Sequence, residues 1–538
     1  MLQSLHRPFE ALSPTIGASP DELKIIFSLL LSYPLAAVLK RVPDARPARK
    51  NAFIILISVF YLVVLFDLWH GLATLLLSAI GSYCIAKYLR HSPFMPWLGF
   101  FFLMAHMSVS HIKRQMADSP ATVDVTGAQM VLVMKLSAFC WNVADGQLPP
   151  QHLSDLQRDR ALTNVPPLLD FAGYVFFFPS LLLGPAFDYA EYSRWIDTSM
   201  FDVPTDMDPA KRPPVRKRRR IPRSGSPAAA RAALGLVWIG LYAYLVPRFS
   251  PNHLVTDSFL HHKLPARIIV MYLVNLVARF KYYGVWTLAE GSCILAGLGY
   301  NGVDAISGTV YWNRLQNVDP WAVETAQNPR GYLAGWNKNT NNWLRNYVYL
   351  RVTPRGKKPG FRASLTTFAT SALWHGFYPG YYLSFVLASL IQTAAKNYRR
   401  LLRPFFVDPV SGEPTAHKKY YDAFSFVVTQ LTFSFTTTPF LVLGLSYSLR
   451  VWSRVYFYAL AWTMASLVLF ASPAKAMIKA RLEQRQGKAR AGMARSVSTD
   501  SLLAKEPILG ISPDAQRDLN EAVREIKAEV EARQKKNC

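Results

Sequence analysis

Residues 51–66, NAFIILISVFYLVVLF, contain no charged side chain, and neither do residues 68–86, LWHGLATLLLSAIGSYCIA. Each stretch approaches the roughly 20 apolar residues that a helix needs to cross a bilayer. Uncharged blocks of similar length recur at 232–247, 423–449 and 455–473. Because a soluble core does not need such blocks repeatedly, the pattern predicts an all-α, polytopic membrane protein with about ten to twelve transmembrane or re-entrant helices.

The composition agrees with a membrane protein. Of 538 residues, 51% are hydrophobic and 17% charged, and the mean hydropathy is +0.12. The net charge is +26, with basic clusters at 211–220 and 475–495. Basic runs also occur in nucleic-acid-binding proteins, but between membrane spans they are typical of cytosolic loops that meet anionic lipid. We therefore expect membrane lipids, and no nucleic acid, as partners.

The chain divides into three parts. Residues 1–22 are a polar N-terminal lead, residues 23–473 form the transmembrane domain, and residues 474–538 form a basic cytosolic tail. Inside the domain, residues 202–230 are rich in Pro, Arg and Ser and predict a disordered cytosolic loop. In the tail, apolar residues at helical spacing predict a short amphipathic helix over 514–536. Spans are expected near 23–39, 51–66, 69–88, 94–110, 127–143, 231–247, 266–284, 380–395, 423–447 and 455–473, whereas the glycines of 285–310 predict a weak or very closely packed helix.

The C-terminus resembles a signal for retrieval to the endoplasmic reticulum. Lys535 and Lys536 stand fourth and third from the end, as in a dilysine retrieval signal of the endoplasmic reticulum, although a lysine-rich tail also produces this by chance. Retrieval machinery reads such a signal from the cytosol, the side that the basic tail also indicates. We predict a multi-pass protein of the endoplasmic reticulum membrane with a cytosolic C-terminus. The four cysteines lack CxxC spacing and predict neither a disulfide framework nor a zinc site, so no metal is expected.

Two short polar patches stand out within the apolar chain. Residues 336–345, WNKNTNNWLR, are an asparagine-rich cluster, and residues 372–382, ALWHGFYPGYY, set His375 in an apolar run. An ionisable side chain inside a membrane is costly, so His375 is a candidate functional residue, although a hydrogen-bonded structural histidine is the commoner case.

The chemistry of the two side chains is complementary. Histidine can take up a proton near neutral pH, and the Asn337 amide can donate hydrogen bonds to a carbonyl oxygen that gains negative charge. A base and an amide donor suffice for acyl transfer to a hydroxyl. GxSxG is absent, and no nucleophilic Ser or Cys with an adjacent base is evident, so direct attack by the acceptor hydroxyl is the simpler route.

A third patch follows a long apolar run at residues 184–192, GPAFDYAEY. The Gly-Pro pair interrupts a helix, and Asp188 and Tyr189 then bring polar and aromatic character to a membrane boundary. Two interpretations remain open from the residues alone: an interfacial aromatic belt or a wall of a substrate chamber.

Taken together, these motifs resemble those of a known protein family. Trp336-Asn337 followed by Trp343-Leu344, then Trp374-His375-Gly376 with Pro379-Gly380-Tyr381-Tyr382, resembles the membrane-bound O-acyltransferase family, including the spacing between Asn and His. Residues 184–189 and the Lys418-Lys419-Tyr420-Tyr421 segment are similar to its lysophospholipid acyltransferase branch. The resemblance covers about residues 50–470.

The resemblance implies a fold and an activity. The helices would surround a central chamber in which a fatty acyl group passes from acyl-CoA to the free hydroxyl, mainly at sn-2, of a lysophospholipid, as in the Lands cycle of phospholipid remodelling. His375 would be the base and Asn337 would position the thioester, with no cofactor besides the co-substrate acyl-CoA. The residues beside the substrates would be Trp336, Trp374, Tyr381, Asp188 and Tyr189. The charges of Arg345, Arg351 and Lys357 suggest that they would contact CoA phosphates.

Other functions stay open. Related branches of the family acylate sterols, diacylglycerol or proteins. The sterol and diacylglycerol branch carries a Phe-Tyr-x-Asp-Trp-Trp-Asn signature, whereas this chain has Ala334-Gly335-Trp336-Asn337, which argues against that branch. A multi-span transporter is the alternative from another class. It would be expected to show related halves or several intramembrane charges, whereas here the polar residues concentrate around 313–375.

Overall fold

The computed structural model describes residues 2–117, 123–205, 207–215, 219–353, 361–409 and 411–493. Over these ranges the regular structure is helical, and the only strand-like pairings are three isolated bridges, Val215–Pro222, Val303–Val310 and Val407–Pro414. The prediction of an all-α protein is confirmed. The amphipathic helix expected at 514–536 and the dilysine pair lie outside the described residues.

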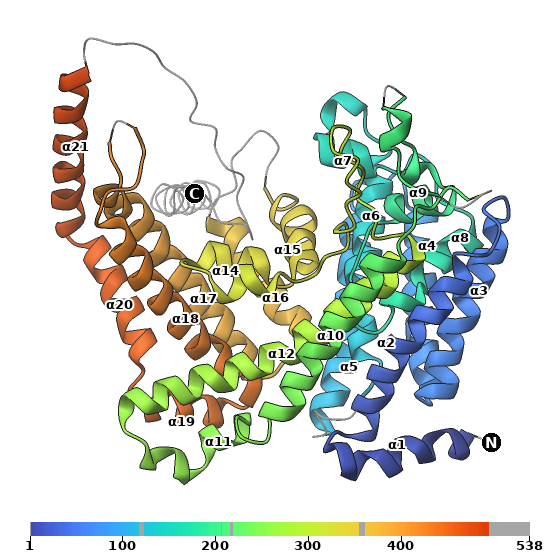
Figure 1. The fold of residues 1–538 in the computed structure, drawn as a ribbon, viewed down its shortest axis with the longest axis horizontal. Coiled ribbons are helices and arrows are strands. Elements are labelled where there is room, and N and C mark those ends of the chain that lie inside the picture. Colours follow the sequence, from blue (N-terminus) through green and yellow to red (C-terminus); the bar gives the residue numbers. More distant parts are fainter. Residues whose placement is uncertain are drawn as a thin grey trace, which may run out of the picture. The chain divides into compact units, whose positions relative to one another are not determined.

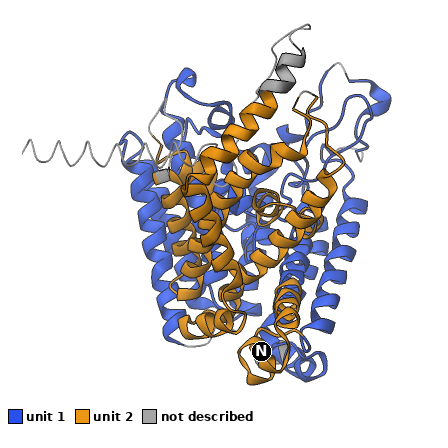
Figure 2. Ribbon diagram, turned by 90° about the vertical axis from the view of Figure 1, so that its left-hand side faces the viewer, with its two compact units in different colours: residues 1–248, 277–318, 338–343 blue, residues 249–276, 319–337, 344–538 orange. Residues whose placement is uncertain are grey.

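The chain forms two compact units, coloured in Figure 2. Unit 1 comprises residues 1–248, 277–318 and 338–343, and unit 2 comprises residues 249–276, 319–337 and 344–538. The chain passes from one unit to the other several times, once inside the long helix α12 (Leu264–Ala296).

Unit 1 holds most of the N-terminal helices, which Figure 1 shows in blue to green. They are α1 (Leu2–Ile16), α2 (Pro20–Leu39), α3 (Pro47–Val59), η1 (Phe60–Leu65), α4 (Trp69–Tyr88), α5 (Met95–Met116), α6 (Thr126–Asp145), η2 (Pro150–His152), α7 (Asp155–Arg160), α8 (Leu168–Val175), η3 (Phe178–Ser180), α9 (Tyr189–Ile196), η4 (Ser199–Phe201), η5 (Pro209–Lys211) and α10 (Gly225–Leu245). Unit 1 also includes most of α15 (Lys338–Leu344), which is yellow in Figure 1. The start of α2 is fixed by a capping box between Ser19 and Glu22, with Pro20 in the first turn. Helices α4, α5 and α6 pack against one another.

Unit 2 holds α11 (Pro251–Val255), η6 (Asp257–His261), α13 (Pro320–Glu324), α14 (Pro329–Gly335), η7 (Arg345–Tyr349), α16 (Phe361–His375), α17 (Pro379–Asn397), η8 (Tyr398–Leu402), η9 (Arg403–Phe406), α18 (Lys418–Val442), α19 (Leu445–Arg454), α20 (Tyr458–Ala471) and α21 (Ala474–Met493). Its core contains Leu387 and Ile391 of α17, Phe435 of α18 and Trp452 of α19. The rings of Phe435 and Trp452 stack with centroids 4.7 Å apart. This core holds α17 and α18 side by side (Figure 1).

Six helices in the described part of the chain are long and apolar enough to cross a membrane: α2, α3 with η1, α4, α6, α10 and α12. The pair α19 and α20, bent by 81°, would bring the number to seven if it formed one span. The prediction of ten to twelve also counted re-entrant segments. The run before Pro185, for example, forms only the short helices α8 and η3.

Three local expectations can be compared with the structure, and only the second of them differs from it. The lead at 1–22 contains the helix α1. The expected loop at 202–230 is partly ordered, since α10 begins at Gly225 and Lys40 Nζ donates hydrogen bonds to the Pro222 carbonyl (2.6 Å) and Ser224 Oγ (2.8 Å). The glycine-rich stretch continues α12 to Ala296 because its glycines allow close packing, as where Gly291 meets the Tyr33 side chain.

Candidate active site

Asn337 occupies a break between two short helices. Helix α14 ends at Gly335, Trp336 is extended, and α15 begins at Lys338. The φ of Asn337 is 43°, in the left-handed region that most side chains avoid and that asparagine tolerates better than other non-glycine residues. The backbone thus turns sharply at Asn337, and the side chain is half-buried.

Several residues just after Asn337 have structural partners. The Lys338 N–H donates to the Asn317 carbonyl (2.7 Å), and Asn339 Nδ2 donates to Asn317 Oδ1 (3.0 Å). Further along α15, Trp343 Nε1 donates to Ser137 Oγ on α6 (2.9 Å). These bonds fix α15 immediately after Asn337, so Asn339 belongs to the supporting structure of the patch.

His375 is the last residue of α16, and the chain leaves the helix through Gly376, whose φ is 118°. The Gly376 N–H donates to the carbonyls of Ala372 (3.2 Å) and Leu373 (3.1 Å), which closes the helix end. The His375 side chain is half-buried. A histidine at a helix end, rather than in the middle of a helix, can present its ring beyond the last turn.

Four aromatic rings surround the imidazole of His375. Ring centroids of Trp374, Tyr381, Phe385 and Phe440 lie 4.7, 5.6, 5.4 and 4.9 Å from it. We call these four residues the aromatic box. The structure thus brings three predicted residues together, His375, Trp374 and Tyr381.

A glycine allows the box to close. Gly380, near the start of α17, donates its N–H to the Leu443 carbonyl (2.8 Å) just after α18. A Cβ on Gly380 would collide with the backbone oxygens of Pro439 and Leu443. The closeness of the two helices places Tyr381 against Phe440, with ring centroids 4.8 Å apart.

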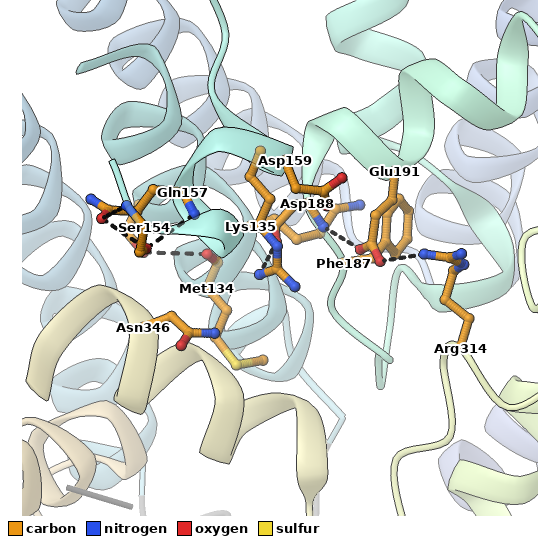
Figure 3. Close-up of polar contacts among 12 residues, drawn as sticks. Met134, Lys135, Ser154, Gln157, Asp159, Phe187, Asp188, Glu191, Arg314 and Asn346 are labelled. Carbon is orange, nitrogen blue, oxygen red and sulfur yellow. Dashed lines mark hydrogen bonds and ion pairs between the residues drawn. The ribbon is translucent and has the colours of Figure 1, made fainter. Parts of the chain in front are cut away.

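The predicted wall at 184–192 forms a separate set of contacts in unit 1, which Figure 3 shows. Asp188 caps α9 in a capping box with Glu191 and forms an ion pair with Arg160. Glu191 also pairs with Arg314 (3.3 Å). The Tyr189 ring is buried against Tyr174 (5.4 Å between centroids), and burial, followed by the charge of Asp170, raises the pKa of Tyr189 well above its ordinary value. Both predicted residues thus have structural partners, and their contact with substrate stays a prediction.

Two of the predicted phosphate-binding residues lie in η7 (Arg345–Tyr349) or just after it. Arg345 is half-buried at the start of η7, and Arg351 donates from Nε to the Asn346 carbonyl (3.2 Å) and lies over the Tyr347 ring. Lys357 lies outside the described residues. Among the described residues, no group of three or more His, Cys, Asp or Glu side chains could hold a metal ion.

Sequence reasoning missed Phe385 and Phe440, and it gave no role to Gly380, which it noted only as part of a motif. Phe385 follows Tyr381 by four residues, so helical spacing places both on one face of α17 and could have identified it. Phe440 lies far along the chain on α18, and only the packing of α17 against α18 reveals it. That Asn337 and His375 meet stays a prediction, although both belong to unit 2.

The fold and these features are those of a multi-span membrane protein with a histidine-centred site. Residues 119–438 match the sequence model of the MBOAT, or membrane-bound O-acyltransferase, family. The chain is 44% identical to a lysophospholipid acyltransferase of Schizosaccharomyces pombe over 89% of its own length and 92% of the relative's. It is 42% identical to one of Saccharomyces cerevisiae (87% and 78% of the two chains) and 27% identical to lysophospholipid acyltransferase 5 of Mus musculus (88% and 94%). The chain belongs to the membrane-bound O-acyltransferase family.

Proposed function

We propose that this protein is a lysophospholipid acyltransferase that transfers a fatty acyl group from acyl-CoA to the free hydroxyl, mainly at sn-2, of lysophospholipids. The observation that carries the proposal is the similarity to lysophospholipid acyltransferases of two yeasts, which extends over nearly nine-tenths of the chain. The half-buried histidine in its aromatic box supports the same chemistry, because it is a base in a largely apolar site.

The reaction follows from the two candidate catalytic side chains. His375 accepts the proton of the acceptor hydroxyl while the hydroxyl oxygen attacks the thioester carbonyl. Asn337 Nδ2 donates a hydrogen bond to the carbonyl oxygen as negative charge develops on it. The carbon–sulfur bond then breaks, an ester bond has formed, and the CoA thiolate takes the proton from the imidazolium.

The surrounding residues would bind substrate. The aromatic faces of Trp374 and Tyr381, together with Trp336, offer apolar contact to acyl chains near the thioester. Arg345 would meet a phosphate of the donor. No cofactor besides the co-substrate is required by this mechanism.

The acceptor class is tested with the purified full-length protein. Labelled acyl-CoA is supplied with lysophosphatidylcholine, lysophosphatidylethanolamine, a sterol or diacylglycerol, and labelled product is separated and counted. We expect phospholipid product only. Acylation of the sterol or diacylglycerol with no lysolipid acylated would move the protein to another branch of the family.

The catalytic role of His375 is tested in the same assay. Removing a general base typically costs about 10²- to 10⁴-fold in rate, so His375→Ala should lose nearly all activity at unchanged thermal stability. The matched control is His253→Ala, which removes another half-buried histidine of unit 2 that contacts an aromatic ring, Phe259. Full activity in His375→Ala would disprove the mechanism.

We also propose that the protein resides in the endoplasmic reticulum with its C-terminus in the cytosol. The basic residues near 475–495 and the Lys535–Lys536 pair support this. Replacing both lysines with alanine should shift a tagged protein to later secretory compartments in cells. An unchanged distribution would exclude retrieval through the dilysine pair.

A further inference from the structure

Two buried glutamines of unit 2 lack hydrogen-bond partners. Gln392 on α17 is 4% exposed, and neither its Nε2 nor its Oε1 has a partner in the described part of the chain. Gln430 on α18 is 3% exposed; its Nε2 donates to the Val323 carbonyl (2.9 Å), but its Oε1 has no partner among the described residues. Buried amides are normally satisfied, so these atoms indicate a polar group that the chain does not supply.

The two carboxamides lie at the same height. Helices α17 and α18 run antiparallel, because Gly380 at the start of α17 contacts Leu443 just after α18, and Phe406 after α17 contacts Tyr421 at the start of α18. Gln392 is 12 residues beyond Gly380, and Gln430 is 13 residues before Leu443. At ~1.5 Å per residue, both lie about 18–20 Å from that crossing.

Gln392 also faces the same side as the aromatic box. It follows Tyr381 by 11 residues and Phe385 by seven, and both of those rings contact His375. At 3.6 residues per turn these spacings place Gln392 about 20° from each of the two rings around α17, and between them, because Tyr381 and Phe385 differ by about 40°. Gln392 therefore lies on the helix stripe that borders His375, about 10 Å further along the axis than Phe385.

Arginine side chains lie beyond the end of this stripe. Arg399, seven residues after Gln392, is exposed at the start of η8. Arg330 of α14, a helix that packs on α17, has its pKa lowered by burial and by the nearby charge of Arg399. The order along α17 is thus histidine with aromatic rings, then a buried carboxamide, then guanidinium groups.

We propose that Gln392, with Gln430 at the same height on α18, binds an amide of the pantetheine arm of the acyl-CoA donor while the thioester lies beside His375. This rests on the proposed function. Each pantetheine amide offers one N–H donor and one carbonyl acceptor, which the Gln392 carboxamide complements on both sides. An extended chain advances about 1.2 Å per bond, and the second amide is seven to eight bonds from the sulfur. It therefore lies roughly 8–10 Å away, close to the height of Gln392, and the phosphates lie further on toward Arg399.

The test compares two donors that differ at this amide. The S-acyl derivative of N-acetylcysteamine keeps the first amide of the arm and lacks the second, whereas acyl-CoA has both. Gln392→Leu should lower kcat/KM for acyl-CoA about tenfold, the loss expected for one buried hydrogen-bonded contact. It should change kcat/KM for the truncated donor less than twofold and leave the KM for lysophospholipid unchanged.

The matched control is Gln129→Leu, which removes a buried glutamine of unit 1 whose Oε1 also lacks a partner among the described residues. It should leave the ratio between the two donors unchanged. If Gln392→Leu does not fold, Gln392→Met takes its place in the same comparison.

The possible outcomes separate this proposal from the proposed function. Equal losses with both donors would make Gln392 a structural residue and overturn the assignment, as would unchanged kinetics with both. In either case acyl-CoA remains a donor and the proposed function stands. If the wild-type protein does not use acyl-CoA at all, the proposed function itself fails.

Discussion

Gly380 controls how closely α17 approaches the end of α18, and Gly380→Ala tests whether that approach positions the aromatic box. An added Cβ would lie 2.8 Å from the Leu443 carbonyl oxygen and nearer still to that of Pro439, where about 3.5 Å is comfortable. Both obstacles are backbone atoms, so α17 or α18 must shift by well over half an ångström. Overpacking of this kind costs about 1–3 kcal/mol of stability.

The larger effect should be on activity. Tyr381 follows Gly380 directly and Phe440 follows Pro439, so the displaced segments are those that carry two rings of the box. A misplacement of about 1 Å at a catalytic site can reduce the rate roughly 10²-fold. We expect Gly380→Ala to lower kcat by about this factor while the detergent-solubilised protein still unfolds cooperatively at a reduced Tm.

A second glycine of unit 2 provides the control. A Cβ on Gly331 in α14 would meet nothing closer than Asn328 Oδ1 at 3.7 Å, an ordinary contact. Gly331→Ala should leave kcat unchanged and, because alanine favours helix, be neutral or slightly stabilising. If Gly380→Ala matched Gly331→Ala in both kcat and Tm, the close approach of α17 and α18 would not position the site.

Three further predictions follow from single positions. Asn337→Gly should keep the left-handed turn yet lose activity about 10²-fold or more, because the amide donor is gone. Asn337→Ala should lose activity likewise and also lower the Tm, because alanine disfavours the left-handed backbone. An equal Tm for the two variants would show that the turn is not strained. Phe440→Leu should reduce kcat severalfold by opening one side of the box around His375, and an unchanged kcat would remove Phe440 from the site. The hydrogen bond from Arg194 holds the pKa of Asp159 below its ordinary value. The stabilisation from this pair should therefore be complete at neutral pH and be lost as the pH falls through that lowered pKa. Since the pair is substantially exposed, Asp159→Asn should cost about 0.2–1 kcal/mol at pH 7, and unfolding in denaturant should show this cost shrinking steadily in acid.

Much of the fold can be predicted from hydrophobic blocks because a span must be long and apolar. The expected span at 69–88 coincides with α4, and that at 127–143 differs from α6 by only one or two residues at each end. Composition is a poor guide where tertiary contacts order a polar segment. Residues 219–224 look disordered by composition, yet Arg219 Nη1 donates to the Val42 carbonyl (2.9 Å) and Lys40 holds Pro222 and Ser224.

The candidate site was predictable only in part, for a similar reason. His375 and its neighbours Trp374 and Tyr381 lie close together in the chain, so their contacts are local. Phe440 comes from a distant helix, and nothing in its own surroundings distinguishes it from other phenylalanines of α18. Gln392 is polar in an apolar helix, but only the structure shows that it is buried without a partner in the described chain.

Helix α17 gathers several groups of the candidate site on one face. One face of this helix contributes two rings around His375 and a buried carboxamide, and the exposed Arg399 follows in η8. In a membrane each buried polar group carries a cost, so a helix that spaces them along a single stripe leaves its other faces free to pack, as Leu387 and Ile391 do in the core. A donor with an apolar chain, a thioester, amides and phosphates in that order requires the same sequence of surroundings, and α17 with the first turn of η8 can provide it.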